Sequence, residues 1–315
     1  MPSSDTRELT SSTDLSPTLV RVAVPHFCRM DGASAEGYGS SRDEARVHRG
    51  VALSRCLGSL LALARGLEES ILGIADQTLI DAPASICPEC HLSAVILDCH
   101  VFVTGDSFQA DILSAFDRRI TVHHVDLPDP RRLPHAARDF LLQDLAPGNA
   151  DLSLYLEDDL VVHDRLFVDK FMWFFQRTDH QFALMPHRYE LTGDPCQARL
   201  FVDGPIAEDI FPGHHQPRES VARGRFWDGQ SVDFDIAANP HSGCFGVSAQ
   251  QRQFLVGRVC ADDGFISPLE TVATFTVLQH WPVIKPSWQH RDFLLVEHAH
   301  PSFLWARHQW SEAGG

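Results

Sequence analysis

The chain has 315 residues and a formal net charge of −16, because 42 acidic residues outnumber 26 basic ones. Hydrophobic residues make up 44% and charged residues 22% of it, proportions that are typical of a globular protein with a large buried core. Such an acidic chain has no general attraction for nucleic acid or for an anionic membrane surface. A phosphorylated ligand would therefore need a metal ion or a local basic cluster.

No segment of the sequence predicts export or membrane insertion. Residues 1–17 are rich in Ser, Thr and Asp and lack an apolar signal-peptide core, so we expect a disordered N-terminal tail. No apolar stretch reaches the length of about 18 residues that a transmembrane helix needs. Eight cysteines spread along the chain favour reduced thiols in a cytoplasmic protein over a disulfide framework.

Strands alternate with helices along the first part of the chain. Strands are predicted at 19–24, 93–103, 120–125, 152–156 and 182–185, and helices at 43–65, 108–116, 136–145 and 164–177. This order is typical of an α/β protein with a mostly parallel sheet flanked by helices. After Glu190 the pattern is irregular to about Pro240. It then predicts a strand at 244–248, a helix that begins at Ala249 and a helix at 268–278.

Three consecutive acids, Glu157, Asp158 and Asp159, directly follow the apolar run 152–156. Adjacent carboxylates raise one another's pKa unless a cation or strong hydrogen-bond donors offset their charge. Mg²⁺ or Mn²⁺, which prefer oxygen ligands, are the simplest offset. The carboxyl end of a parallel strand is also where α/β sheets bind ligands. The competing interpretation is that Asp159 only complements the dipole of the next helix.

The segment Tyr155-Leu156-Glu157-Asp158-Asp159 and the α/β pattern before it resemble the GT-A class of nucleotide-sugar-dependent glycosyltransferases. The acids look like the DxD-type motif of that class in its EDD form. The resemblance implies a GT-A-like, Rossmann-like fold, in which residues 18–190 bind the sugar nucleotide and a mixed half, residues 191–315, binds the acceptor. It also implies that Asp159 is the main metal ligand, that Asp158 supports it and that Glu157 contacts the donor.

The same resemblance implies residues for the metal and for catalysis in the second half. A histidine near the C-terminus often completes the metal site of this class, and here His298 or His300 follows an apolar run. An Asp or Glu often deprotonates the acceptor hydroxyl, and here Glu270 is the first choice and Asp263 the reserve. The competing interpretation is that Glu270 is a solvated residue in the first turn of its helix.

The nucleotide would be bound after the first strand, where the family has a donor-binding loop. By position this loop contains Pro25, His26, Phe27 and Arg29. The guanidinium of Arg29 would meet a phosphate and the ring of Phe27 would stack on the base. Asp106, beyond the second long strand, is a further nucleotide contact.

Cys87-Pro88-Glu89-Cys90-His91 has the literal form of a c-type haem attachment site. Haem attachment would need export, which the sequence does not predict. A structural zinc site that combines Cys87 and Cys90 with Cys99 and His100 is a second interpretation, and unliganded thiols are the default.

Together these patterns predict a glycosyltransferase that uses Mn²⁺ or Mg²⁺ to move a sugar from a nucleoside-diphosphate sugar to a hydroxyl acceptor. A metal-dependent sugar-nucleotide hydrolase or nucleotidyltransferase is an alternative, although no Gly-rich phosphate loop follows the first strand. A non-catalytic module that binds glycans through exposed Trp and His residues is another. No nucleobase or acceptor signature is present, so the donor nucleotide, the sugar and the acceptor are unassigned.

Overall fold

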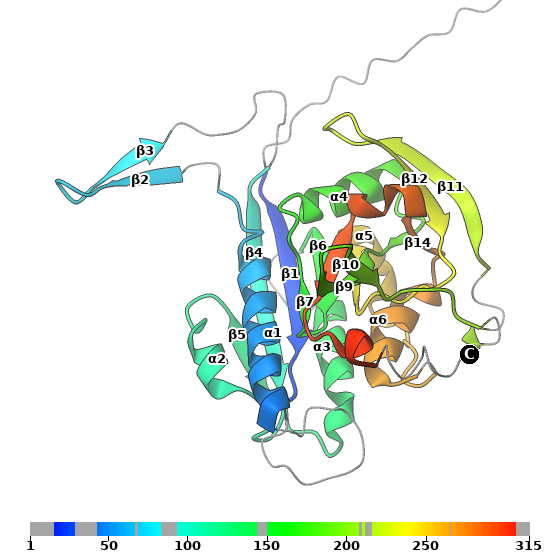
Figure 1. Cartoon of the computed structure of the whole chain (residues 1–315), viewed down its shortest axis with the longest axis horizontal. Helices are drawn as coiled ribbons and strands as arrows, with labels where there is room; N and C mark the ends of the chain where they lie inside the picture. Colours follow the sequence, from blue (N-terminus) through cyan, green and yellow to red (C-terminus); the bar gives the residue numbers. More distant parts are fainter. Residues whose placement is uncertain are drawn as a thin grey trace, which may run out of the picture.

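The computed structural model describes residues 16–28, 43–66, 69–82, 93–143, 150–207, 210–211, 216–264 and 266–306. Its centre is a five-stranded sheet with the order β13-β6-β1-β4-β5 (Figure 1). These strands are β13 (Cys244–Ser248), β6 (Leu152–Leu156), β1 (Thr18–Pro25), β4 (Val95–Val103) and β5 (Thr121–His124). The last four are parallel to one another, and β13 pairs antiparallel with β6. The predicted α/β fold with a mostly parallel sheet flanked by helices is confirmed.

Helices cover both faces of this sheet, and each face has its own core. The helices are α1 (Asp43–Leu61), α2 (Ala110–Ser114), α3 (Leu133–Leu142), α4 (Phe167–Arg177), α5 (Ala249–Leu255) and α6 (Pro268–Leu278), with a 3-10 turn η2 (Pro130–Arg132). Val20, Val22 and Val24 of β1 pack into the core that contains residues of α1 and α4. Ala23 packs into the core with α3 and α6. Because both faces are buried, β1 reads in the sequence as a nearly continuous apolar run.

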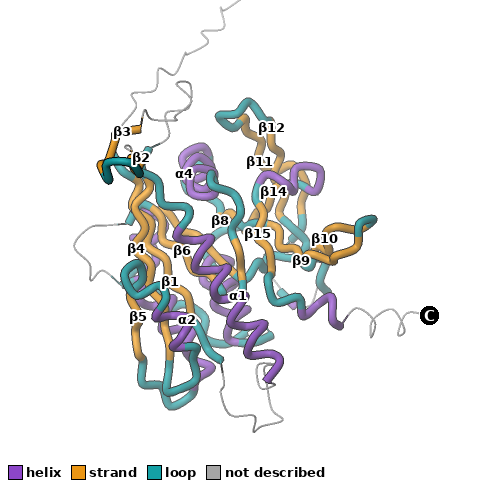
Figure 2. The backbone as a smooth tube through the Cα atoms, turned by 60° about the vertical axis from the view of Figure 1, so that its left-hand side comes forward, coloured by secondary structure: helices purple, strands orange, loops and turns teal. Residues whose placement is uncertain are grey.

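Two smaller sheets and a hairpin complete the fold. One sheet has the order β10 (Gln197–Phe201), β9 (His187–Asp194), β15 (Leu295–His298) and β7 (Leu160–Val161). The other has the order β11 (Arg218–Arg225), β12 (Ser231–Ile236), β14 (Val283–Pro286) and β8 (Ala183–Leu184), and the 3-10 helix η4 (Trp288–Phe293) follows β14. Figure 2 shows β9, β10 and β15 side by side, while β2 (Glu69–Gly73) and β3 (Thr78–Ala82) form a hairpin that extends away from the rest in Figure 1.

Several sequence predictions need correction. The predicted helix at 43–65 ends at Leu61, because the backbone of Arg65 instead exchanges hydrogen bonds with Val95 beside β4. The predicted irregular segment after Glu190 is wrong, since it contains the second half of β9 and all of β10, β11 and β12. These strands carry many polar and charged side chains, which hid them in the sequence. The hairpin 69–82 was not predicted either.

Other expectations stay predictions. The tail at 1–17 falls, apart from its last two residues, outside the described residues. The division of the chain at residue 190 also stays a prediction, and β9 crosses that position. Among the helices of the described residues, none is both long enough and apolar enough to span a bilayer.

Candidate active site

The acidic triplet forms a buried turn between β6 and β7, at the point where the order of the central sheet reverses. The backbone N–H of Glu157 donates to the carbonyl of Gly243 at 3.0 Å, and that of Ala299 donates to the carbonyl of Asp159 at 2.8 Å. All three acidic residues are at most 9% exposed. The chain leaves β1 for β4 and β5 on one side and returns to β6 on the other. The acids therefore lie at a topological switch point, where open α/β sheets bind ligands.

Asp158 is held by a histidine and an arginine from the first half of the chain. His26 Nδ1 lies 2.6 Å from Asp158 Oδ2, and Arg49 Nη2 donates to Asp158 Oδ1 at 2.9 Å. The backbone N–H of Gln109 donates to His26 Nε2 at 3.1 Å, so Nε2 is an acceptor and Nδ1 carries the proton given to Asp158. His26 thus connects the end of β1, the acidic turn and the start of α2 as a neutral imidazole.

Asp159 faces His298, which is itself anchored by a second carboxylate. His298 Nε2 lies 3.5 Å from Asp159 Oδ2, and Nδ1 lies 2.7 Å from Glu190 Oε1. Arg49 also donates to Asp159 Oδ2 at 3.3 Å. Burial alone would raise the pKa of Asp159, but the charge of His298, its hydrogen bond and the charge of Arg49 hold that pKa well below its usual range. Asp159 Oδ1 is buried and has no hydrogen-bond partner among the described residues.

Glu157 is the least compensated acid of the turn. Burial, and then the charge of Asp159, raise its pKa above the usual carboxyl range. Its Oε1 is buried and unpartnered within the described part of the chain. Gly243 lies directly beneath the carboxyl group at φ +65°, and a Cβ there would stand 2.9 Å from Glu157 Oε2. The carboxyl group therefore has its place only because residue 243 is glycine.

A buried cationic cluster lies next to these acids. Lys285 Nζ donates to Asp203 Oδ2 at 3.0 Å and to the carbonyl of His241 at 2.6 Å. Arg188 contacts Asp203 Oδ1 at 3.0 Å. Burial would raise the pKa of Asp203, but Lys285 and then Arg188 lower it to about 2. One carboxylate thus balances two buried cations, and the charge of Arg188 also acts on Glu157.

The two predicted base residues differ in their surroundings. Glu270 lies in the first turn of α6, accepts a hydrogen bond from Ser267 and is close enough to Glu157 for its charge to raise the pKa of that residue. Burial raises the pKa of Glu270 itself. Asp263 lies on an exposed loop. The structure therefore brings Glu270 toward the acidic turn and leaves Asp263 at the surface.

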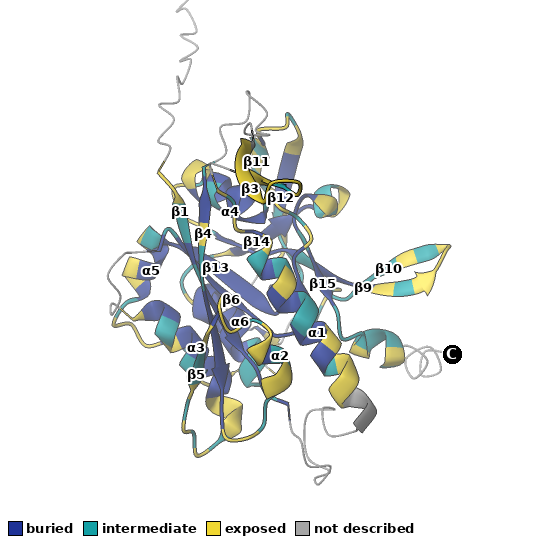
Figure 3. Cartoon of the chain, turned by 90° about the vertical axis from the view of Figure 1, so that its left-hand side faces the viewer, coloured by how far each residue is buried: buried dark blue, intermediate teal, exposed yellow. Residues whose placement is uncertain are grey.

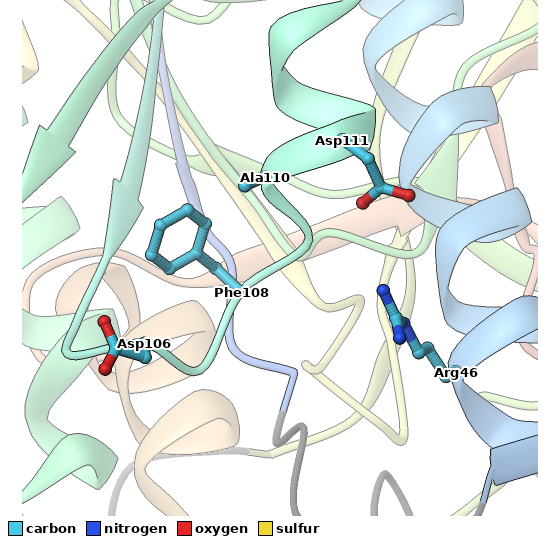
Figure 4. A pocket seen from close by; sticks show the side chains of 5 residues that line it. All are labelled: Arg46, Asp106, Phe108, Ala110 and Asp111. Atoms are coloured by element: carbon cyan, nitrogen blue, oxygen red, sulfur yellow. The ribbon is translucent and has the colours of Figure 1, made fainter.

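Most of the residues predicted to bind a nucleotide lie outside the pocket that the structure has near the end of β4. An open pocket of about 470 Å³ lies between α1 and the segment that joins β4 to α2 (Figure 4). It is lined by Arg46, Asp106, Phe108, Ala110 and Asp111. Of the residues expected there, Asp106 lines this pocket, whereas Phe27 packs against the core beside α3.

Three other residues that were predicted to bind the nucleotide or the metal differ in where they lie. Pro25 ends β1 and is buried there. Arg29 lies outside the described residues. His300 is partly buried, and burial, followed by the charge of Arg49, lowers its pKa. Its ring contacts Trp305 at a centroid distance of 4.9 Å.

The side chains of this turn fit a divalent cation that is completed by a ligand. No group of three or more His, Cys, Asp or Glu side chains in the described ranges is arranged to hold a metal ion. Mg²⁺, however, usually takes one or two protein ligands and completes its shell with water and substrate phosphates. Asp159 has an unused buried oxygen, and Glu190 orients His298 as carboxylates orient metal-ligating histidines. Asp159 and His298 are therefore the residues that could hold such an ion.

Sequence reasoning missed Arg49, Arg188 and Glu190, which touch or influence the acids. Arg49 is separated from Asp158 by 109 residues in the chain, and Glu190 from His298 by 108. No local pattern connects such pairs. The alternation of charged and apolar residues from His187 to Leu191 is a strand signal that could have placed Glu190, but it was not used. The predicted zinc ligands Cys87 and Cys90 lie outside the described residues.

No family model matches the sequence, and no curated protein matches it. The crystal structure of TarS 1-349 from S. aureus is similar over 89% of this chain, with 10% sequence identity and a TM-score of 0.38. This chain spans 58% of that protein. The structure of 4-diphosphocytidyl-2C-methyl-D-erythritol synthase from Anaerococcus prevotii is similar over 89% of this chain and 92% of that one, with 8% identity and a TM-score of 0.32. Likenesses of this size carry no statement about activity.

Proposed function

We propose that this protein is a metal-dependent glycosyltransferase that moves a sugar from a nucleoside-diphosphate sugar to a hydroxyl acceptor. The observation that carries the proposal is the buried acidic turn at the switch point of the parallel sheet. In this turn Asp159 keeps one buried oxygen without a partner in the described residues and faces the anchored His298. A set of carboxylates this deeply buried is expected where a cation and a phosphorylated ligand bind.

The donor would extend from the pocket to the acidic turn. Phe108 offers a ring on which a base can stack, and Asp106 offers a carboxylate for the base or ribose. Arg46 lines the pocket, and Arg49, three residues later on α1, reaches the acids. Residues at this spacing share one face of a helix. Their guanidinium groups therefore supply the local positive charge that a diphosphate needs in a chain of net charge −16.

Asp159 and His298 would hold the cation, with Glu190 keeping the imidazole in place. A bound Mg²⁺ or Mn²⁺ would stabilise the negative charge that develops on the departing diphosphate. Burial disfavours the charged imidazole, but Asp159 and Glu190 raise the pKa of His298 to about 9. Metal ligation requires the neutral ring, so we expect cation binding to release this proton.

Glu270 would act as the general base toward the acceptor hydroxyl. Its raised pKa makes it a stronger proton acceptor than an ordinary carboxylate, and its charge acts on Glu157. Asp263 is the reserve candidate if the loop that carries it moves toward the acceptor.

The donor site is tested by thermal denaturation with Mn²⁺ and a series of nucleoside diphosphates. A diphosphate that binds should raise the Tm by roughly 5 °C at saturation, because it stabilises only the folded state. Asp159→Ala should abolish the rise that depends on Mn²⁺. Asp292→Ala, which alters an exposed carboxylate, is the matched control and should keep it. An unchanged Tm with every nucleoside diphosphate would overturn the donor site.

The reaction type is tested with the sugar nucleotide that corresponds to the stabilising diphosphate. Transfer to an added acceptor that is lost in Asp159→Ala is the expected result. Equal release of free sugar with and without acceptor would identify a hydrolase. Binding of glycans that survives Asp159→Asn, without any turnover, would favour a non-catalytic binding module.

A further inference from the structure

The sheet that carries part of the candidate site has a second face with a different composition. Side chains alternate along a strand, so Arg188 and Glu190 of β9 point to the inner face, toward the acidic turn, with His298 of β15. Tyr189 therefore points to the opposite, outer face. Phe201 of β10 is its cross-strand partner, so the two rings lie side by side on that face.

Aromatic rings and guanidinium groups alternate across this outer face. Arg199 lies over the rings of both Tyr189 and Phe201, at 5.4 and 5.7 Å from their centroids. Arg291 of η4 lies over Phe201 at 5.6 Å and over Trp288 at 4.8 Å. We call Tyr189, Arg199, Phe201, Arg291 and Trp288 the aromatic–arginine strip. Figure 3 shows the β9–β10 hairpin, which carries three of these residues, extending from the body of the molecule.

The end of the strip is an exposed but fixed indole. Trp288 is 58% exposed. Its ring packs edge-on against Phe201 at a centroid distance of 4.9 Å and against His187 at 6.0 Å. The carbonyl of Trp288 also accepts a hydrogen bond from Arg291 at 2.9 Å. A large apolar ring that is held in place while facing solvent is prepared to stack on a ligand at little cost in conformational entropy.

One cation of the strip has no acid to balance it. Arg199 pairs with Asp292 at 2.8 Å. Arg291 has no carboxylate partner within the described residues, and apart from the bond of its Nη1 to the carbonyl of Trp288 its guanidinium group has no hydrogen-bond acceptor there. This guanidinium therefore has donors available for a hydroxyl or carboxylate group of a molecule stacked on Trp288.

We propose that the aromatic–arginine strip is a binding surface for a carbohydrate chain, separate from the candidate active site. The apolar C–H face of a sugar ring stacks on an indole, and its hydroxyl groups accept hydrogen bonds from guanidinium donors. Single-stranded nucleic acid also stacks on aromatic rings, but its phosphates would be repelled by a chain of net charge −16. A neutral or weakly acidic glycan satisfies the stacking geometry without that repulsion.

The test is a binding experiment on a printed array of neutral and acidic oligosaccharides, with the full chain and without metal or nucleotide. The wild-type protein should bind a subset of the glycans, and Trp288→Ala should weaken that binding about tenfold or more, the effect of one lost stacking contact. Arg291→Gln should weaken it as well. Trp227→Ala is the matched control, because Trp227 is 48% exposed, stacks on Phe226 and lies outside the strip. It should bind as the wild type does.

Three results would overturn the proposal. They are the absence of any bound glycan with the wild-type protein, equal binding by Trp288→Ala and Trp227→Ala, and preferential binding of a labelled oligothymidylate. An unchanged Tm for each variant shows that the fold is intact. Because no nucleotide or metal is present, the outcome is independent of whether the donor site exists.

Discussion

The inner and outer faces of the β10-β9-β15 sheet carry arginine side chains in opposite settings. On the inner face, Arg188 is 6% exposed and contacts the buried Asp203. On the outer face, Arg199 is paired with Asp292, an acid whose side chain is 59% exposed. Successive residues of one strand, Arg188 and Tyr189, thus contribute to a buried ionic cluster and to the aromatic–arginine strip.

This difference shows that the contribution of an ion pair to stability depends on what surrounds it. In the buried cluster, removal of one charge leaves another without compensation, and water cannot replace it. At the outer face, water and mobile ions screen each charge, so a pair contributes little. The inner face should therefore govern stability, while the outer face is free to serve binding.

The largest effect should come from the buried acid. Asp203→Asn leaves Lys285 and Arg188 without their shared carboxylate and should lower the free energy of unfolding by about 3–5 kcal/mol. Asp292→Asn at the outer face should lower it by less than about 1 kcal/mol. Urea denaturation at neutral pH measures both. Equal costs would show that the two faces do not differ as described.

A second prediction concerns pH and His187. Burial, followed by the charge of Lys285, lowers the pKa of His187 to about 4, whereas the unfolded chain has a value of about 6.5. Because the pKa of His187 is lower in the folded protein than in the unfolded chain, the stability that its neutral imidazole contributes is fully present above about pH 6.5. That contribution is lost as pH falls toward 4. The free energy of unfolding of the wild type should therefore fall by up to about 3 kcal/mol through protonation of this group at low pH.

His187→Gln should lack this loss, because glutamine does not titrate and its amide can still donate to the carbonyl of Pro286. Between about pH 7.5 and pH 4.5, the free energy of unfolding of the wild type should fall by up to about 3 kcal/mol more than that of the variant. A difference that is constant between the two pH values would contradict the assignment.

A third, smaller effect should separate two glycines that share a left-handed conformation. Gly243 has φ +65° and lies under Glu157, whereas Gly193, near the end of β9, has φ +72° and no neighbouring atom within 4 Å of the point where a Cβ would lie. Both alanine substitutions incur the left-handed strain of about 1–2 kcal/mol. Gly243→Ala should cost about 1–3 kcal/mol more, because its methyl group overlaps the carboxyl group.

Thermal or urea denaturation of the two alanine variants measures this difference. Gly243→Ala should also reduce binding of a nucleoside diphosphate with Mn²⁺, while Gly193→Ala should leave it unchanged. Equal destabilisation by both substitutions would mean that the Glu157 carboxyl group moves aside without cost.

Prediction from the sequence succeeded where burial and local signals coincide. The strand at 152–156 has the predicted bounds, since all five residues are buried and the run ends at the three acids. Helix α6 also has its predicted bounds, because Pro268 occupies an early helical position and apolar residues follow. Prediction failed for β9 to β12, where exposed charged residues interrupt the apolar alternation.

The residues of the candidate site also fall into those that the sequence could predict and those that it could not. The acidic turn could be predicted because three carboxylates after a buried strand are unfavourable without a partner. Asp106, which lines the pocket, was predicted as a nucleotide contact only from its position after a strand, and that role stays a prediction. Arg49 and Glu190 could not be predicted, since each acts on a residue more than a hundred positions away.

The sequence by itself determined that the chain forms an α/β sheet with a concentration of negative charge at the end of one strand. The tertiary structure decided which cations meet that charge, because Arg49 and His298 reach it only after α1 and β15 pack beside the turn. It also decided which side chains of β9 face the candidate site and which form the aromatic–arginine strip. Hydrophobic periodicity is a local property of the chain, whereas the partner of a buried charge is selected by packing.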